Sequence, residues 1–194
     1  MPGKILNIPN ILTLSRVALI PVFLLIAYWP PAIGIAGHSG SLTRHIVLAS
    51  LFALAAITDW LDGYLARLMN QGSAFGRFLD PVADKLMVAA ALVVLVQWQP
   101  NIWMAFAAIV IISREITVSA LREWMAELGN RASVAVSWVG KLKTTFQLIS
   151  ITVFLLNIPA LMPVSYILLY IAVILTLWSM MIYLRVAWPY LKAD

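Results

Sequence analysis

The chain has 194 residues, of which 63% are hydrophobic and 11% are charged, and it contains no cysteine. This composition excludes an ordinary soluble domain and indicates a membrane protein, and the lack of cysteine excludes disulfides and thiol chemistry. The net charge is +5, but the basic residues border apolar segments, which membrane orientation explains more simply than nucleic-acid binding. We therefore expect a single membrane domain over residues 1–194 and no nucleic-acid partner.

Six apolar stretches follow one another along the chain, each long enough to cross a bilayer as a helix. We predict an all-α, polytopic membrane protein with six transmembrane helices and a polar cavity at its inner face. Turn-forming residues separate the helices, for example Trp29-Pro-Pro after the first and Gln99-Pro-Asn after the third. The predicted helices cover residues 10–29, 43–69, 75–97, 102–128, 133–156 and 164–186.

The basic residues predict how the helices are oriented. Six helices place both termini on one side of the membrane. If that side is the cytosol, all of the 13 Lys and Arg residues except Arg44 lie at or near inner helix ends. The positive-inside rule therefore predicts cytosolic termini, and a functional site near the basic residues would face the cytosol.

The first helix begins with polar residues at a regular spacing. Asn10, Thr13 and Arg16 are each three residues apart, so they line one side of its first turns. An ordinary anchored helix start is one interpretation. The other is that these residues bind a lipid or its pyrophosphate group.

Acidic residues gather where the second and third helices meet, although the chain has only 8 Asp and Glu. Asp59 and Asp62 are three residues apart and Asp80 and Asp84 are four apart, so each pair shares a helix face. A solvated helix end explains one acid but not four at these spacings. Carboxylates that converge in a membrane protein need cations, and hard divalent ions such as Mg²⁺ are suitable partners. The small residues that share these faces and leave space beside the charges are Gly63, Ala66 and Gly76.

Basic residues near the same helix ends give the region the composition of a phosphate site, because Arg and Lys bind phosphoryl oxygens. Arg114 lies inside an apolar helix, where an unpaired charge costs about 2.5–3.5 kcal/mol. A salt bridge to Glu115 or to an Asp of another helix is the structural alternative. Arg131 and Arg185 are interpreted as orientation anchors. The basic residues considered for the phosphate site are Arg67, Arg77, Arg114, Arg122, Lys141 and Lys143.

The acidic region carries a recognisable motif, Asp59-x2-Asp62-Gly63-x2-Ala66-Arg67-x8-Gly76-x3-Asp80-x3-Asp84. It resembles the motif of the CDP-alcohol phosphotransferases at every fixed position. Less specific similarity to the family extends over nearly the whole chain. Residues 7–16, 113–116, 120–124 and 140–144 resemble the bacterial members of the family that use glycerol 3-phosphate as acceptor.

The resemblance implies a six-helix enzyme of the bacterial inner membrane, usually a homodimer, whose cavity opens to the cytosol and the inner leaflet. It implies that Asp59, Asp62 and Asp80 bind divalent metal, with Asp84 near the metals as general base. The implied cofactor is Mg²⁺ or Mn²⁺, as two ions. The implied nucleotide-binding residues are Asp59, Asp62, Gly63, Ala66, Arg67, Gly76 and Asp80.

The reaction implied by the resemblance transfers a phosphatidyl group from CDP-diacylglycerol to the sn-1 hydroxyl of glycerol 3-phosphate. The products would be phosphatidylglycerophosphate and CMP, in the first committed step to phosphatidylglycerol and cardiolipin. The acceptor phosphate needs cations of its own. Arg114, Arg122 and Lys141 are the nearest candidates that the motif leaves unassigned, although Arg122 and Lys141 also suit ordinary positions near helix ends.

Several alternatives remain at this point. Within the family the acceptor could be serine or phosphatidylglycerol, although neither requires the same additional cations. A magnesium-dependent membrane prenyltransferase also uses two aspartate clusters, but these are far apart in sequence. A divalent-cation transporter would place acids near the middle of the membrane on several helices, whereas here they lie at the inner ends of two.

Overall fold

The computed structural model describes the backbone of residues 8–29, 40–69, 74–129 and 138–192. These residues form helices and short connections and contain no strand. Six of the helices are long and apolar enough to cross a membrane, which confirms the predicted all-α, six-helix protein. The elements are α1 (Ile8–Tyr28), α2 (Gly40–Met69), α3 (Ala74–Trp98), α4 (Ile102–Glu127), α5 (Trp138–Leu156), the short 3-10 helix η2 (Pro159–Leu161) and α6 (Met162–Leu191).

Most helix ends lie within a few residues of their predicted positions, and the largest described difference is at the end of α6. The sequence predicts an end near residue 186, before Pro189, but the helix continues to Leu191. A proline this close to a helix end removes only one backbone hydrogen bond, so the last turn tolerates it. The predicted start of the fifth helix at residue 133 lies outside the described residues.

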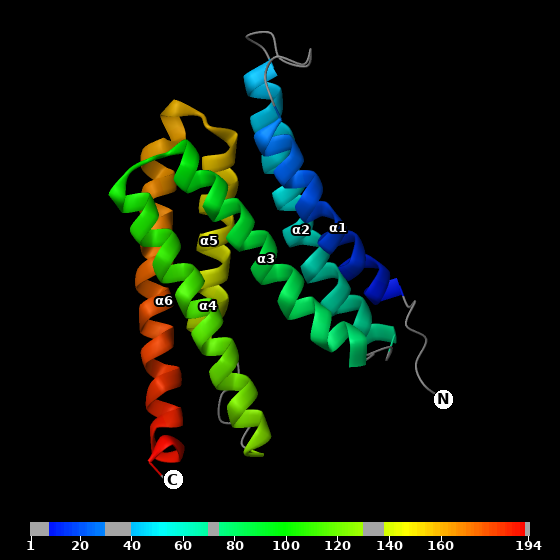
Figure 1. The fold of residues 1–194 in the computed structure, drawn as a ribbon, viewed down its shortest axis with the longest axis vertical. Coiled ribbons are helices and arrows are strands. Elements are labelled where there is room, and N and C mark those ends of the chain that lie inside the picture. Colours follow the sequence, from blue (N-terminus) through cyan, green and yellow to red (C-terminus); the bar gives the residue numbers. More distant parts are fainter. Residues whose placement is uncertain (1–7, 30–39, 70–73, 130–137, 193–194) are drawn as a thin grey trace.

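The helices form two groups that share an interface. α1 packs against α2 and α3, while α6 packs against α5 and α4, and contacts of α2 with α5 and of α3 with α4 join the groups (Figure 1). The beginning of α1 and the end of α6 lie at the same end of the bundle (Figure 1). The end of α2, the beginning of α3 and the end of α4 lie there too, so the acidic motif and the polar half of α4 share one end of the molecule.

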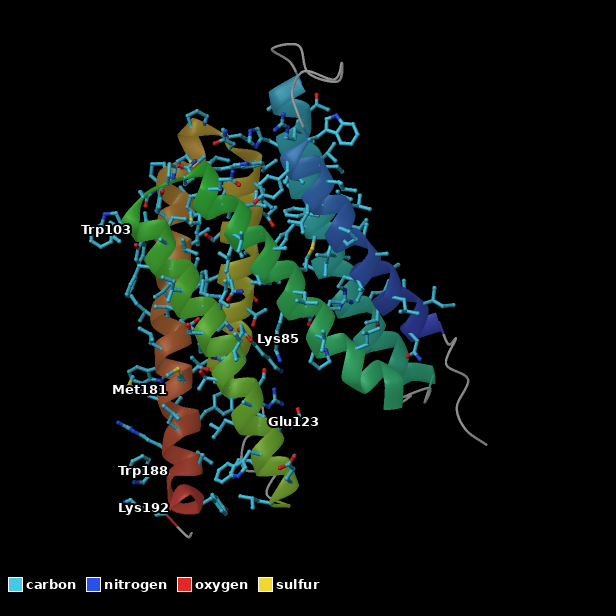
Figure 2. The ribbon with its side chains drawn as sticks, in the orientation of Figure 1. Lys85, Trp103, Glu123, Met181, Trp188 and Lys192 are labelled. Carbon is cyan, nitrogen blue, oxygen red and sulfur yellow. The ribbon has the colours of Figure 1, made fainter. Side chains whose placement is uncertain are left out.

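The interior is apolar and the outer surface is also largely apolar. Phe23, Phe52 and Phe154 are buried in a core that draws on all six helices. Trp103 and Trp188 point outward from α4 and α6 (Figure 2) and are more than half exposed. Because lipid solvates apolar side chains, exposed residues of this kind fit a chain whose helices cross a membrane.

A side chain in the connection between α3 and α4 fixes the beginning of α4. The Asn101 carboxamide oxygen accepts a hydrogen bond from the Met104 backbone N–H at 2.9 Å, which caps the helix. Its Nδ2 donates to the Tyr166 hydroxyl at 2.8 Å. One residue therefore both begins α4 and links it to α6.

We expect Asn101→Ala to lower the free energy of unfolding by about 2 kcal/mol, because both the cap and the link to α6 are lost. Tyr166→Phe removes only the link and keeps the ring that packs edge-on against Phe154, so its loss should be about 1 kcal/mol or less. Thermal and denaturant unfolding of the purified protein in detergent measures both. Equal losses for the two variants would mean that the cap contributes nothing.

Candidate functional site

The polar side of α1 faces the rest of the protein. Asn10, Thr13 and Arg16 are 2%, 1% and 1% exposed, so the three residues predicted to share a face do share one, and it is buried. Among the described helices, α1 packs mainly against α2 and α3. The register of α1 therefore directs its one arginine toward the two helices that carry the acidic motif.

Arg16 joins one carboxylate from each of those helices. Its Nη1 donates to Asp59 Oδ1 at 2.8 Å and to Asp84 Oδ1 at 2.6 Å. The two carboxylates are 40% and 42% exposed, whereas Arg16 is 1% exposed. The arginine is thus the inner member of the cluster, and the acids are its outer members. Binding of a lipid or its pyrophosphate was one of two interpretations of Arg16, and neither interpretation included these acidic partners.

A small cavity of about 80 Å³ lies beside this ion cluster. Arg16, Asp59 and Asp84 form its charged part, and Thr144 of α5 also lines it. The rest of its wall is apolar or weakly polar, which places carboxylates directly beside a surface suited to a hydrocarbon chain. The remaining lining residues are Phe52, Ala55, Ala56, Met87, Val88 and Leu148.

Two of the four motif acids have described side chains, and those two fit a divalent cation. Asp59 and Asp84 come from different helices yet reach the same nitrogen, so their oxygens already converge on one cationic group. One arginine charge does not balance two carboxylates, and carboxylate oxygens are the ligands that Mg²⁺ prefers. The side chains of Asp62, Ala66, Arg67 and Asp80 lie outside the described residues, as does the surface of Gly63, so the complete four-acid cluster stays a prediction. Gly76 is buried.

A second polar cluster lies between α4, α5 and α6. Lys143 of α5 forms a short ion pair with Glu115 of α4, and the Arg114 guanidinium lies 3.5 Å from the same carboxylate oxygen. Arg114 also donates to the Ser179 hydroxyl of α6 and lies 5.6 Å above the Tyr183 ring. The salt bridge of Arg114 to Glu115, which we considered as a structural alternative, is therefore present.

The remaining acceptor-site candidates lie on the surface. Arg122 and Lys141 are exposed, whereas Lys143 is 3% exposed. We considered Lys143 for the phosphate site but did not include it among the acceptor candidates, although the helical period distinguishes it from Lys141. Lys143, Gln147 and Ser150 are three or four residues apart and all are buried on one face of α5, so the helical period alone separates Lys143 from Lys141.

One further lysine links the two groups of helices. Lys85 follows Asp84 on α3 and reaches toward α4 (Figure 2), where its Nζ donates to the Ser119 hydroxyl. α3 therefore presents Asp84 to the ion cluster of α1 and α2 while the next residue contacts α4. This contact connects the acidic motif with the polar half of α4.

The sequence matches the CDP-alcohol phosphatidyltransferase family over residues 6–178. The chain belongs to this family. It is 51% identical over 194 residues to the CDP-diacylglycerol–glycerol-3-phosphate 3-phosphatidyltransferase of Pseudomonas fluorescens, covering 97% of this chain and 94% of that protein. It is 50% identical over 182 residues to the protein of the same name from Haemophilus influenzae, covering 93% of each chain. The protein of that name from Pectobacterium atrosepticum is 48% identical over 182 residues, with 93% of this chain and 94% of that one covered.

Membership of the CDP-alcohol phosphatidyltransferase family confirms the motif resemblance and identifies a multi-pass membrane enzyme of phospholipid synthesis. Enzymes of this family generally depend on divalent metal, in agreement with the converging carboxylates of Asp59 and Asp84. The family therefore favours phosphatidyl transfer over the prenyltransferase and cation-transporter alternatives.

The two neighbouring lysines of α5 provide a matched test of the second polar cluster. We expect Lys143→Met to lower the free energy of unfolding by about 2–3 kcal/mol, because Glu115 loses its closest cation in a largely buried place. The loss should stay below that of a completely unpaired charge, since Arg114 remains 3.5 Å from Glu115. Unfolding of the purified variant in detergent measures it.

Lys141→Met is the control, and we expect it to change stability by less than about 0.5 kcal/mol because Lys141 is exposed. Adding Glu115→Gln to Lys143→Met should recover part of the loss, since the double variant no longer contains an unbalanced carboxylate. Equal effects of the two lysine variants would contradict a structural ion pair at Lys143.

Proposed function

We propose that this enzyme transfers the phosphatidyl group of CDP-diacylglycerol to the sn-1 hydroxyl of glycerol 3-phosphate, releasing CMP and phosphatidylglycerophosphate. The observation that carries the proposal is the identity of about half of all residues, over nearly the full chain, with proteins named for this reaction. The reaction is the first committed step to phosphatidylglycerol and cardiolipin. Transfer to serine or to phosphatidylglycerol is the alternative within the family.

The acidic motif supplies the reacting groups in this proposal. Asp59, Asp62, Asp80 and Asp84 hold two divalent ions, Mg²⁺ or Mn²⁺, which when bound neutralise charge on the phosphoryl oxygens. Asp84 accepts the proton of the acceptor hydroxyl, and the freed oxygen attacks the lipid-side phosphorus while the bond to CMP breaks. The apolar wall beside Asp59 and Asp84 supports the assignment of a lipid as donor.

The remaining binding roles follow the charges and the small residues. Gly63, Ala66, Arg67 and Gly76 accommodate the cytidine nucleotide, as the family motif implies. Asn10, Thr13 and Arg16 lie on the buried side of α1 and contribute to binding the lipid pyrophosphate. Arg114, Arg122 and Lys141 bind the acceptor phosphate through charge-assisted hydrogen bonds.

The cellular arrangement completes the proposal. The enzyme lies in the bacterial inner membrane as a homodimer, with both termini and the active site facing the cytosol. The distribution of Lys and Arg along the sequence supports this orientation. The beginning of α1 and the end of α6 lie at the same end of the bundle, as both termini on one side of the membrane require (Figure 1).

A transfer assay with purified protein tests the acceptor. With labelled CDP-diacylglycerol, we expect glycerol 3-phosphate to be used in strong preference to serine and phosphatidylglycerol. Arg122→Ala and Lys141→Ala should each raise the KM for glycerol 3-phosphate about tenfold or more, because a hydrogen bond between charged groups contributes roughly 1.5–3 kcal/mol. The KM for CDP-diacylglycerol should stay nearly unchanged.

Arg122 and Lys141 suit this test because both are exposed, so their replacement should not disturb the fold, whereas Arg114 is buried and contacts Ser179. Arg185→Ala is the control. Arg185 is also exposed but lies on α6, and its replacement should leave both KM values unchanged. Preference for serine or phosphatidylglycerol would refute the acceptor but not the family.

Asp84→Asn tests the assignment of the general base. The amide keeps an oxygen that can accept the hydrogen bond from Arg16, so the variant should fold and bind nucleotide, but it cannot take up the proton. We expect kcat to fall by a factor of about 100 to 10,000, the usual contribution of general base catalysis. Steady-state kinetics at saturating substrate gives the value.

Asp59→Asn is the matched control, because Asp59 contacts the same arginine nitrogen. It should weaken the binding of metal and nucleotide, and added metal should restore more of its turnover than that of Asp84→Asn. A turnover near that of the unaltered enzyme in Asp84→Asn would place the base elsewhere.

A further inference from the structure

A single nitrogen atom of Arg16 accounts for both described ion pairs of the acidic site. Nη1 lies 2.8 Å from Asp59 Oδ1 and 2.6 Å from Asp84 Oδ1. The two acids come from helices α2 and α3, and the arginine comes from α1. Asp59 and Asp84 thus share one cationic group, and the same two carboxylates would hold a divalent cation.

The charges explain why something positive has to be there. Two carboxylates that contact the same group repel each other, and their buried side toward Arg16 is shielded from water. Arg16 removes the repulsion within the protein itself, but one positive charge leaves the group of three with a net negative charge. The group therefore still attracts a divalent cation from the exposed side, where Asp59 and Asp84 are 40% and 42% exposed.

We propose that Arg16 is an internal counter-ion that exchanges with divalent metal. Without metal it holds Asp59 and Asp84 together. Bound metal would compete with Arg16 for these two carboxylates, and the released guanidinium would turn to the pyrophosphate of the lipid substrate. This inference rests on the proposed function for the identity of that substrate, but the exchange itself concerns only Arg16, the two acids and the metal.

The surroundings of Arg16 permit such a movement. The backbone of Arg16 is fixed in α1, whose polar face is buried. The guanidinium can therefore move only by rotation about the bonds of its own side chain. The cavity of about 80 Å³ beside Asp59 and Asp84 is lined by Arg16 as well. Space for the displaced guanidinium therefore exists next to the acids, on the side where the apolar wall would meet a lipid.

Competition for shared oxygens predicts that removing the arginine strengthens metal binding. We expect Arg16→Gln to bind Mn²⁺ more tightly than the unaltered protein, by a factor within the range of about 5 to 150 typical of coupled binding. Calorimetry or electron paramagnetic resonance with Mn²⁺ alone, on purified protein in detergent without substrate, measures the affinity. In EDTA the same variant should unfold at a lower temperature, and Mn²⁺ should raise its Tm by more than it raises that of the unaltered protein.

The lipid substrate should respond in the opposite direction. Arg16→Gln should raise the KM for CDP-diacylglycerol about tenfold at saturating Mn²⁺, because a guanidinium–phosphate contact is lost. A purely structural role for Arg16 would weaken metal and lipid binding together. Tighter metal binding combined with weaker lipid binding is therefore the specific sign of the exchange.

Arg44→Gln provides the matched control. It makes the same change of charge on α2, the helix that carries Asp59, at about 22 Å from that residue along the helix axis. Affinity for Mn²⁺ should be unchanged. If Arg16→Gln fails to fold, Arg16→Lys carries the test, because a lysine keeps the charge but not the geometry of the guanidinium. It should bind Mn²⁺ more tightly than the unaltered protein.

The outcomes separate this inference from the proposed function. Unchanged or weaker Mn²⁺ binding in Arg16→Gln, or in Arg16→Lys where only that variant folds, would overturn the exchange and leave the reaction intact. A lack of Mn²⁺ binding by the unaltered protein would overturn both the metal site and the exchange. A different preferred acceptor would change the proposed reaction without affecting the exchange.

Discussion

Charged groups within an apolar chain have to meet partners of opposite sign, and this requirement organises the molecule. Arg16 meets Asp59 and Asp84, which brings together α1, α2 and α3. Lys143 and Arg114 meet Glu115, and Arg114 also reaches Ser179, which brings together α4, α5 and α6. These polar contacts therefore hold the three helices of each group together near their polar ends.

Each group of helices contains one of these clusters, and the two clusters differ in sign and accessibility. The cluster around Asp59 and Asp84 is acidic and partly open, as a site for cations must be. The cluster around Arg114 and Lys143 is cationic and mostly buried, with Glu115 partly exposed. The hydrogen bond of Lys85 to Ser119 connects them through α3, the helix that carries Asp84. In the proposed reaction, the lipid donor and the anionic acceptor would meet between these two charge environments.

Composition and helical period were enough to predict the number of helices and which residues share a helix face. The six apolar stretches gave the helices, and the spacing of Asn10, Thr13 and Arg16 gave a shared face that is indeed buried. The partners of Arg16 could not be derived, because they depend on how α1 rotates against α2 and α3. The burial of Lys143 was not predicted for a different reason. Its charge was counted with that of Lys141, although the period of α5 places only Lys143 in the interior.

The pairing of Arg16 also bears on the order in which the protein is made. A chain synthesised from its N-terminus places α1 in the membrane before α2 and α3 exist, and Arg16 then has neither Asp59 nor Asp84 beside it. An unpaired arginine costs about 2.5–3.5 kcal/mol at the centre of a membrane helix on insertion scales, and less toward the helix end. The first helix therefore reaches its most favourable state only once the third has been inserted, which makes α1, α2 and α3 a natural unit of assembly in the growing chain.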